Sequence, residues 1–153
     1  MPDRRRVLTH SARVAALLAA AGVLPAARAQ QAWPQAAFEA KALPEALKAL
    51  GAGAPVASKD VTLTGPDIAE NGAVVPVTAA TTLPGAKRLL LLVEKNPNVL
   101  SAVFEVNDAV EPNFGTRVKM GQSSNVYAVA LMADGRVLFA QKDIKVTLGG
   151  CGG

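Results

Sequence analysis

The only cysteine of the chain lies two residues from the C-terminus, in the run Gly149, Gly150, Cys151, Gly152 and Gly153. Glycine has no Cβ, so the backbone around this sulfur is thin and pliable. Three extended residues, from Gly149 to Cys151, span about 10 Å. A thiol mounted in this way can enter a narrow pocket of another protein. The pattern predicts a flexible arm at 149–153 that carries a substrate on Cys151 and contributes no catalytic residue.

Other interpretations of the tail remain open on the residues alone. Glycine-rich termini are often no more than loose ends. A single cysteine in an exported protein can also form an intermolecular disulfide, which would make this a structural β-protein that dimerises through Cys151. A ubiquitin-like carrier that uses a C-terminal Gly-Gly as a thiocarboxylate is a third possibility. That chemistry belongs to the cytoplasm, so the export signal argues against it.

Residues 1–29 have the pattern of a twin-arginine-type export signal. Residues 4–6 are all arginine, an apolar run covers 14–24, and 27–29 read Ala-Arg-Ala, a small-residue cleavage pattern. The apolar run is shorter than the ~20 residues of a membrane span. A mitochondrial presequence fits less well, because the cleavage pattern is clear. We therefore predict a periplasmic protein, without a membrane span, that is cleaved after Ala29.

Removal of that segment leaves a neutral chain without histidine. Five of the 16 Lys and Arg and one of the 12 Asp and Glu lie in residues 1–29, so 11 of each remain. A neutral chain has no electrostatic footprint for nucleic acid. His10 is removed as well, so no Ser-His-Asp or Cys-His pair can form, and the usual zinc and copper ligands are lacking. We predict a protein that is not an enzyme and has no metal and no cofactor.

One helical signal lies near the start of the mature domain, which we expect to cover residues 30–148. Within residues 35–50, apolar side chains recur near helical spacing at Phe38, Leu43, Leu47 and Leu50. Pro44 fits the first turn of a helix that ends before Gly51. A partner-docking helix is conceivable, but a helix packed on the edge of a sandwich is the simpler expectation.

Seven strands are predicted after Ser58, at 61–63, 73–77, 88–94, 99–106, 114–120, 125–133 and 136–148. Residues 88–94 are a nearly continuous apolar run and 125–133 are apolar on both faces, which indicates buried strands. Pro76 indicates an edge or bulged position, and Asp134-Gly135 a tight hairpin. The last strand alternates through Leu148 and would anchor the arm. The predicted fold is all-β, an immunoglobulin-like antiparallel sandwich, with a closed barrel as the alternative.

The tail and three interior motifs resemble the SoxY family, the sulfur-carrier subunits of the periplasmic thiosulfate-oxidising (Sox) system. The interior motifs are Glu70-Asn71-Gly72-Ala73-Val74-Val75-Pro76-Val77, Glu94-Lys95-Asn96-Pro97-Asn98 and Val118-Lys119-Met120-Gly121-Gln122-Ser123-Ser124. The resemblance extends over essentially the whole mature chain. One departure is Val99, which follows Asn98 where another proline is expected.

The resemblance implies a heterodimer with SoxZ and covalent sulfur adducts on Cys151. It also implies that SoxAX joins thiosulfate to the thiol, that SoxB hydrolyses the terminal sulfonate to sulfate, and that Sox(CD) oxidises the remaining sulfur. An ordinary thiol is mostly protonated at neutral pH, and no basic residue adjoins Cys151 in the sequence. We therefore expect the thiol to be unreactive alone and to be activated inside a partner's active site.

The remaining motif residues are expected to have minor roles. Lys142 and Lys145 could steer the docking of partners, but lysines on a terminal strand more often form a solvated face. Asn96-Pro97-Asn98 is expected to be a turn and nothing else. Apolar side chains on both faces of the strands could mark the surface that SoxZ covers.

Overall fold

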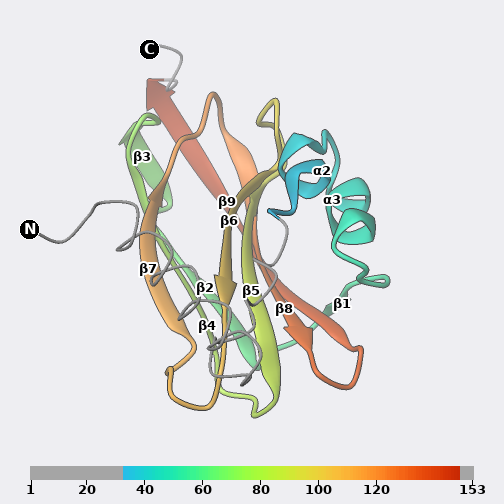
Figure 1. Cartoon of the computed structure of the whole chain (residues 1–153). Helices are drawn as coiled ribbons and strands as arrows, with labels where there is room; N and C mark the ends of the chain where they lie inside the picture. Colours follow the sequence, from blue (N-terminus) through green and yellow to red (C-terminus); the bar gives the residue numbers. More distant parts are fainter. Residues whose placement is uncertain (1–32, 149–153) are drawn as a thin grey trace, which may run out of the picture. The chain divides into compact units, whose positions relative to one another are not determined.

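Two short helices and nine strands make up residues 33–148, the part of the chain that this computed structural model describes (Figure 1). They are α2 (Gln35–Glu39), α3 (Leu43–Ala49), β1 (Val56–Ala57), β2 (Val61–Thr64), β3 (Ile68–Asn71), β4 (Val75–Thr81), β5 (Ala86–Val93), β6 (Leu100–Glu105), β7 (Asn113–Val118), β8 (Ser124–Met132) and β9 (Val137–Leu148). The predicted export signal, 1–29, and the predicted arm, 149–153, lie outside the described residues.

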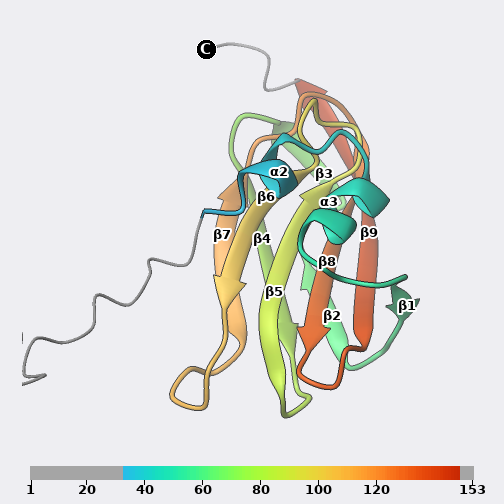
Figure 2. The ribbon, with the colours of Figure 1, turned by 45° about the vertical axis from the view of Figure 1, so that its right-hand side comes forward.

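The strands form two sheets that pack face to face (Figures 1 and 2). The larger sheet has the order β1-β9-β8-β5-β6, with β3 also paired to β9, and the smaller has the order β2-β4-β7. All pairs are antiparallel except β1 and β3, which run parallel to β9. The predicted all-β sandwich is therefore confirmed, and all seven predicted strands are present.

The two strands that the pattern did not predict are β1 and β3. They contain two and four residues, too few for an alternation of apolar and polar side chains to stand out. Both lie on the same edge of β9, β1 opposite Leu138 and Phe139, and β3 opposite the last residues of β9. They exist because β9 offers unpaired backbone groups along that edge.

The main core lies between the two sheets. Leu89, Leu91 and Val93 of β5 pack there with Val126, Ala128 and Ala130 of β8 and with Val75, Val77 and Ala79 of β4. Residues 89–93 are all fully buried, which confirms the strand predicted to be covered on both faces.

Pro76 lies in a part of β4 that pairs with β7 only. The pairing of β4 with β2 ends two residues later in the chain, at Thr78, which lies opposite Thr64. The missing N–H of Pro76 therefore interrupts no ladder on the β2 side.

The helices cover part of the outer face of the larger sheet (Figure 2). Leu47 of α3 is buried in a second cluster with Leu90, Leu92 and Val129, so the expected position on the sandwich edge is wrong. The chain forms two helices because Ala42 is extended (φ −137°, ψ 150°), and a continuous helix would press the Pro44 ring against the carbonyl of Ala40. Pro44 lies in the first turn of α3, as predicted. Neither helix is long and apolar enough to cross a membrane.

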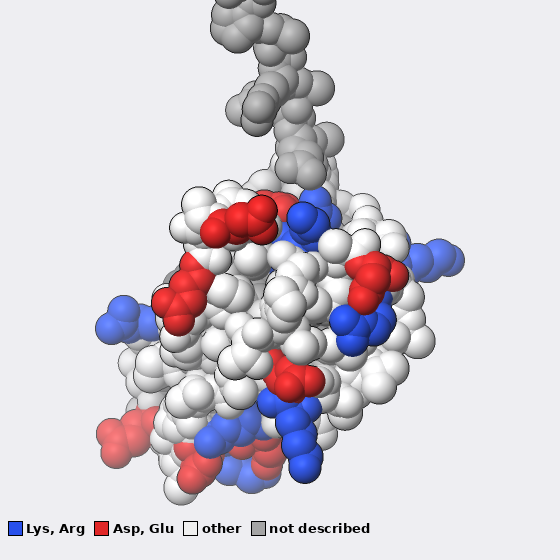
Figure 3. All heavy atoms as spheres, turned by 90° about the horizontal axis from the view of Figure 1, so that it is seen from below, with Lys and Arg blue, Asp and Glu red and all other residues white. Residues whose placement is uncertain are grey.

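One end of the sandwich carries a mixed set of charges. At the end away from Leu148, acidic and basic side chains are intermixed on the surface (Figure 3). Two ion pairs of 2.7 Å lie there, Arg88 with Glu105 and Arg136 with Asp134. The hydrogen bonds that the backbone and side chain of Arg136 donate hold the pKa of Asp134 below its usual value. Arg88 and Arg136 at this end therefore each form an ion pair with a carboxylate.

Candidate functional site

The residues 145–148 of β9 lead from the sandwich to the predicted arm. Pairing with β8 ends at Ile144, which lies opposite Ser124, so the four residues that follow have no β8 partner. Ile144 is fully buried, whereas Leu148 is 70% exposed. Other segments must therefore hold this end of the strand. We call residues 145–148, together with the segments 67–73 and 119–124 that contact them, the arm base.

Strand β3 holds one side of the arm base. It pairs with β9 in parallel, from Ile68 opposite Lys145 to Asn71 opposite Leu148. The Lys145 N–H donates to the carbonyl of Asp67 at 2.9 Å, and the Thr147 hydroxyl donates to the carbonyl of Glu70 at 3.0 Å. The last strand residue before the predicted arm is therefore in a defined ladder register.

Ser123 holds the other side, where β8 no longer pairs. The Val146 N–H donates to the Ser123 Oγ at 2.9 Å, and the Ser123 hydroxyl donates to the Val146 carbonyl at 3.5 Å. The Ser123 hydroxyl thus forms hydrogen bonds with both the N–H and the carbonyl of Val146. It stands in for the ladder bonds that β8 supplies up to Ile144.

Gly72 links the end of β9 to the segment that follows β7. Its N–H donates to the Leu148 carbonyl at 2.7 Å, and its carbonyl accepts from the Met120 N–H at 2.7 Å. The turn that carries Gly72 is closed by the Asn71 side chain, whose Oδ1 accepts from the Ala73 N–H at 2.9 Å. Two backbone hydrogen bonds therefore connect the last carbonyl of β9 to Met120.

Asn96 fixes the 119–121 segment from the β5–β6 turn. Its Nδ2 donates to the Lys119 carbonyl at 2.6 Å, and its Oδ1 accepts from the Gly121 N–H at 3.2 Å. Nearby, the Lys95 N–H donates to the Ser124 Oγ at 3.0 Å. The expectation that Asn96-Pro97-Asn98 is only a turn is wrong, because Asn96 supports the arm base from 23 residues away.

The three interior motifs of the sequence therefore meet at one end of the sandwich. Asn71 and Gly72 come from the first motif, Asn96 from the second, and Met120 and Ser123 from the third. The predicted site residues Gly149, Gly150, Cys151, Gly152 and Gly153 lie outside the described part of the chain. Sequence reasoning did not identify the supporting residues individually, although their motifs carried the family resemblance.

The lysines of β9 are engaged by their own chain. Lys142 pairs with Asp67 at 2.8 Å and Lys145 with Asp143 at 2.6 Å. The hydrogen bond from Lys142, followed by its positive charge, holds the pKa of Asp67 below its ordinary value of 3.8. The Lys142–Asp67 pair joins β9 to the residue before β3, so it belongs to the support of the arm base.

The described residues form no cluster of metal-binding side chains. Residues 33–148 contain no group of three His, Cys, Asp or Glu side chains that would hold a metal ion. What the arrangement provides is mechanical: a β-sandwich that holds its last strand by hydrogen bonds up to Leu148, three residues before the cysteine. Fold and sequence thus define a class of β-sandwich proteins in which a cysteine follows the fixed end of the last strand by three residues.

Comparison with protein families identifies the chain more narrowly: it belongs to the SoxY family, whose model, sulfur oxidation protein SoxY, matches residues 46–151. The sulfur carrier protein SoxY from Chlorobium limicola f thiosulfatophilum is 31% identical, over 67% of this chain and 92% of that one, with a TM-score of 0.60. A superoxide reductase (neelaredoxin) variant from Ignicoccus hospitalis shares the fold alone, at 16% identity over 60% of this chain and 94% of its own, with a TM-score of 0.51. The search of curated proteins gave no match.

Proposed function

We propose that this chain carries sulfur-oxidation intermediates covalently on Cys151 and presents them to the enzymes of thiosulfate oxidation. One observation carries the proposal: the family match runs through residue 151, so it includes the cysteine and not the sandwich alone. The structure supports it by holding β9 up to Leu148. Three residues span at most about 10 Å, so the fixed base limits where the thiol can be.

In this proposal the chemistry takes place on Cys151 but is performed by partners. The thiolate and thiosulfate are joined by a new S–S bond, and the two electrons that are released pass to the SoxAX haem enzyme. Water then cleaves the terminal S–S bond in the SoxB site and sulfate leaves, so that a persulfide remains for Sox(CD) to oxidise. The chain itself contributes the sulfur and its placement, and it needs no cofactor and no metal.

The same proposal includes the setting of the reaction. Residues 1–29 direct the chain to the periplasm and are removed after Ala29, and SoxZ binds the mature chain as a heterodimer. The thiol is activated only inside a partner's site. Iodoacetamide should therefore alkylate Cys151 of the full chain at the same rate as the cysteine of a free Gly-Gly-Cys-Gly-Gly peptide. A much faster reaction of the protein would contradict this part.

The decisive experiment is Cys151→Ser in the full chain. We expect the variant to fold normally and to abolish thiosulfate-dependent respiration, while the intact mass of the wild-type chain, purified from cells grown on thiosulfate, shows sulfur adducts. If the variant loses only a covalent dimer and respiration continues, the chain is a disulfide-linked structural protein and the carrier proposal is wrong.

A further inference from the structure

We propose that Asn71 is a site of spontaneous deamidation and that the arm base controls its rate, because the groups that react are held in the contacts that fix the end of β9. The inference goes beyond the proposed function and does not depend on what Cys151 carries. The co-reactant is water, and the products are aspartate and isoaspartate at position 71. Isoaspartate in turn releases the end of β9.

Asn71 is the one asparagine of six that precedes a glycine. Asparagine is a thermally labile residue, and the nucleophile of its deamidation is the backbone nitrogen of the next residue. A side chain on that residue hinders the attack, and Gly72 has none. Asn96 precedes Pro97, which has no N–H, and the other four asparagines precede Asp, Val or Phe. Asn71 is therefore the asparagine that reacts first once its backbone is free.

The reaction joins two neighbouring groups. The Gly72 nitrogen loses its proton to solvent and bonds to the Asn71 Cγ, the Cγ–Nδ2 bond breaks, and ammonia leaves after taking up a proton. The product is a five-membered succinimide ring, which water opens at one of its two carbonyl carbons. Opening at Cγ gives aspartate. Opening at the former main-chain carbonyl gives isoaspartate, in which the chain continues through Cβ and Cγ.

The side chain of Asn71 is already arranged for this attack. It is exposed, and its Oδ1 accepts from the Ala73 N–H at 2.9 Å. This hydrogen bond folds the side chain over the intervening Gly72, as in an Asx turn. It also stabilises the oxyanion that forms when Cγ is attacked. The electrophilic carbon therefore needs no further donor.

The Gly72 nitrogen, by contrast, is held back by β9. Gly72 is buried, and its N–H donates to the Leu148 carbonyl at 2.7 Å while its carbonyl accepts from the Met120 N–H at 2.7 Å. Asn71, opposite Leu148 in the ladder, is held in the extended backbone of β3. A proton in such a bond is not available to solvent. Deamidation therefore proceeds from states in which the end of β9 has separated from Gly72.

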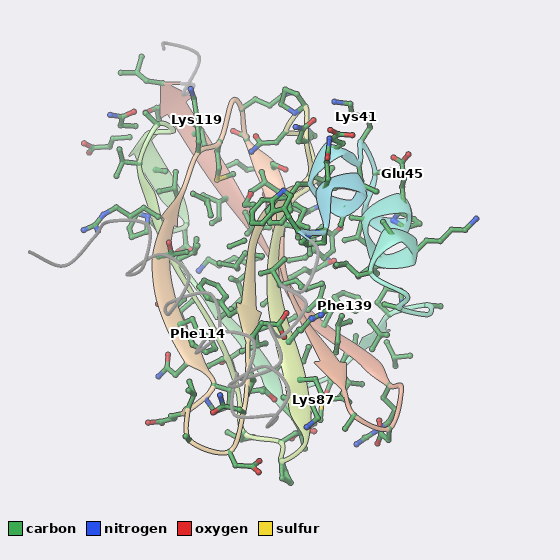
Figure 4. All side chains as sticks on the ribbon, in the orientation of Figure 1. Lys41, Glu45, Lys87, Phe114, Lys119 and Phe139 are labelled. Atoms are coloured by element: carbon green, nitrogen blue, oxygen red, sulfur yellow. The ribbon has the colours of Figure 1, made fainter. Side chains whose placement is uncertain are left out.

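This contact lies where β9 is least buried. Leu148 is 70% exposed, and pairing with β8 ends at Ile144. Figure 4 shows Lys119, the neighbour of Met120, at the end of the sandwich where β9 ends. Local opening requires least free energy where few apolar side chains are buried. The rate of deamidation at Asn71 thus reports how often this end of the strand opens.

Isoaspartate lengthens the main chain between residues 71 and 72 by one carbon atom. On one side of that link is the ladder pair Asn71↔Leu148, and on the other are the hydrogen bonds of Gly72 to Leu148 and Met120. With the extra atom, both sides cannot keep their partners. Aspartate adds no atom to the main chain, and its carboxylate still accepts from the Ala73 N–H. Isoaspartate therefore loosens the arm base irreversibly, whereas aspartate leaves it closed.

The first test compares deamidation in the folded chain and in a free peptide of residues 68–76. Both are kept in neutral buffer, the full chain is digested at intervals, and peptide mass spectrometry measures the conversion of Asn71. We expect conversion in the folded chain to be at least about tenfold slower than in the peptide. Equal rates in the two would overturn the proposed control by the arm base.

Two serine variants of the full chain locate the control. Ser123→Ala frees the Val146 N–H in the arm base and should accelerate the conversion about threefold to tenfold. Ser58→Ala is the matched control, because the Ser58 Oγ also accepts a backbone N–H, that of Asp60. Ser58 bonds to Phe139, which lies away from the end of β9 in Figure 4, so this variant should keep the wild-type rate. No acceleration in Ser123→Ala, or the same acceleration in Ser58→Ala, would contradict the proposal, and thermal unfolding checks that both variants fold.

The second test measures the consequence for the arm base. Amide hydrogen exchange at Met120 should be faster in the isoaspartate form than in the fresh chain, and unchanged at Val129. Asn71→Asp supplies the other product and should keep the slow exchange. Asn71→Ser cannot form the succinimide, while its hydroxyl can still accept from the Ala73 N–H, so storage should not change its exchange.

Slow exchange at Met120 in the isoaspartate form would overturn the proposed release of β9. None of these measurements uses the thiol. The carrier proposal is tested separately, by Cys151→Ser, and either proposal can fail while the other stands.

Discussion

From Val137 to Ile144, strand β9 pairs with β8 residue by residue. From residue 145 to 148 it is held instead by β3, by the Ser123 side chain and by the Gly72 N–H. The first part also contributes Leu138 and Ile144 to the core. The second part ends in Leu148, which is 70% exposed. One strand is thus stabilised by pairing with β8 and by a few buried side chains up to Ile144, and by polar contacts where it approaches the cysteine.

The difference teaches how a sandwich can hold a terminus that its core cannot reach. Burial contributes about 25 cal/mol per Å² of apolar surface, and this contribution ends where the side chains meet water. Hydrogen bonds each contribute about 1 kcal/mol, but they set distance and direction. The arm base uses several of them, from β3, Ser123 and Gly72.

The largest expected effect is on the buried part of β9. Ile144→Ala should lower the free energy of unfolding by about 2–5 kcal/mol, because it leaves a cavity between the sheets. Denaturant unfolding of the full chain measures this. Val146→Ala is the matched control on the arm base, where the side chain is only partly buried, and it should cost clearly less. Equal losses would erase the distinction between the two parts.

A smaller effect is expected at the turn that supports the base. Asn96→Ala removes the bonds to the Lys119 carbonyl and the Gly121 N–H and should cost about 1–3 kcal/mol. Amide hydrogen exchange should speed up at Gly121 and Met120 and remain unchanged at Val129. Asn98→Ala, in the same turn, should leave the exchange of these amides unaffected. If Asn98→Ala accelerated their exchange as much as Asn96→Ala does, a general weakening of the turn would explain both results.

Ser123→Ala should act still more locally. Loss of the hydroxyl leaves the Val146 N–H without its acceptor, which should cost about 1 kcal/mol. The Val146 amide should exchange faster while the amides of 137–144 keep their protection. Ser123→Thr retains the hydroxyl and should restore the slow exchange. If amide exchange became faster along all of β9, the strand would open as one unit, and its two parts would not differ in what holds them.

The smallest effect concerns pH. The pKa of Asp67 is below its ordinary value of 3.8 in the folded chain because of Lys142. A lowered folded-state pKa stabilises the fold above the ordinary value, and this contribution is lost as the pH falls through the folded value. In acid, the Lys145 amide, which donates to the Asp67 carbonyl, should exchange faster than expected from pH alone. Asp67→Asn should remove that pH dependence, and NMR titration of the carboxyl checks the direction of the shift.

Much of the sandwich could be predicted because its signals are local. The alternation in 125–133 and the apolar run in 88–94 reflect which faces of β8 and β5 are buried, and Gly135, with φ 88°, has the conformation that the hairpin turn requires. β3 could not be predicted, since Ile68–Asn71 has no periodic pattern and is a strand only beside β9. The sequence predicted the helical segment but not its division into α2 and α3. It also did not predict that the helices pack on the face of the larger sheet, because this position depends on the sheet residues that they contact.

The sequence by itself determined the strand pattern, the equal numbers of acidic and basic residues after residue 29, and the place of the single cysteine three residues beyond the last strand. These features depend only on residues that are close together in the sequence or on the composition, so no tertiary contact is needed to predict them. Only the tertiary structure decided what holds that strand end. The bonds that do so join residues 23 and 77 positions apart, such as Ser123 with Val146 and Thr147 with Glu70, and such pairs meet only when the sheets have assembled.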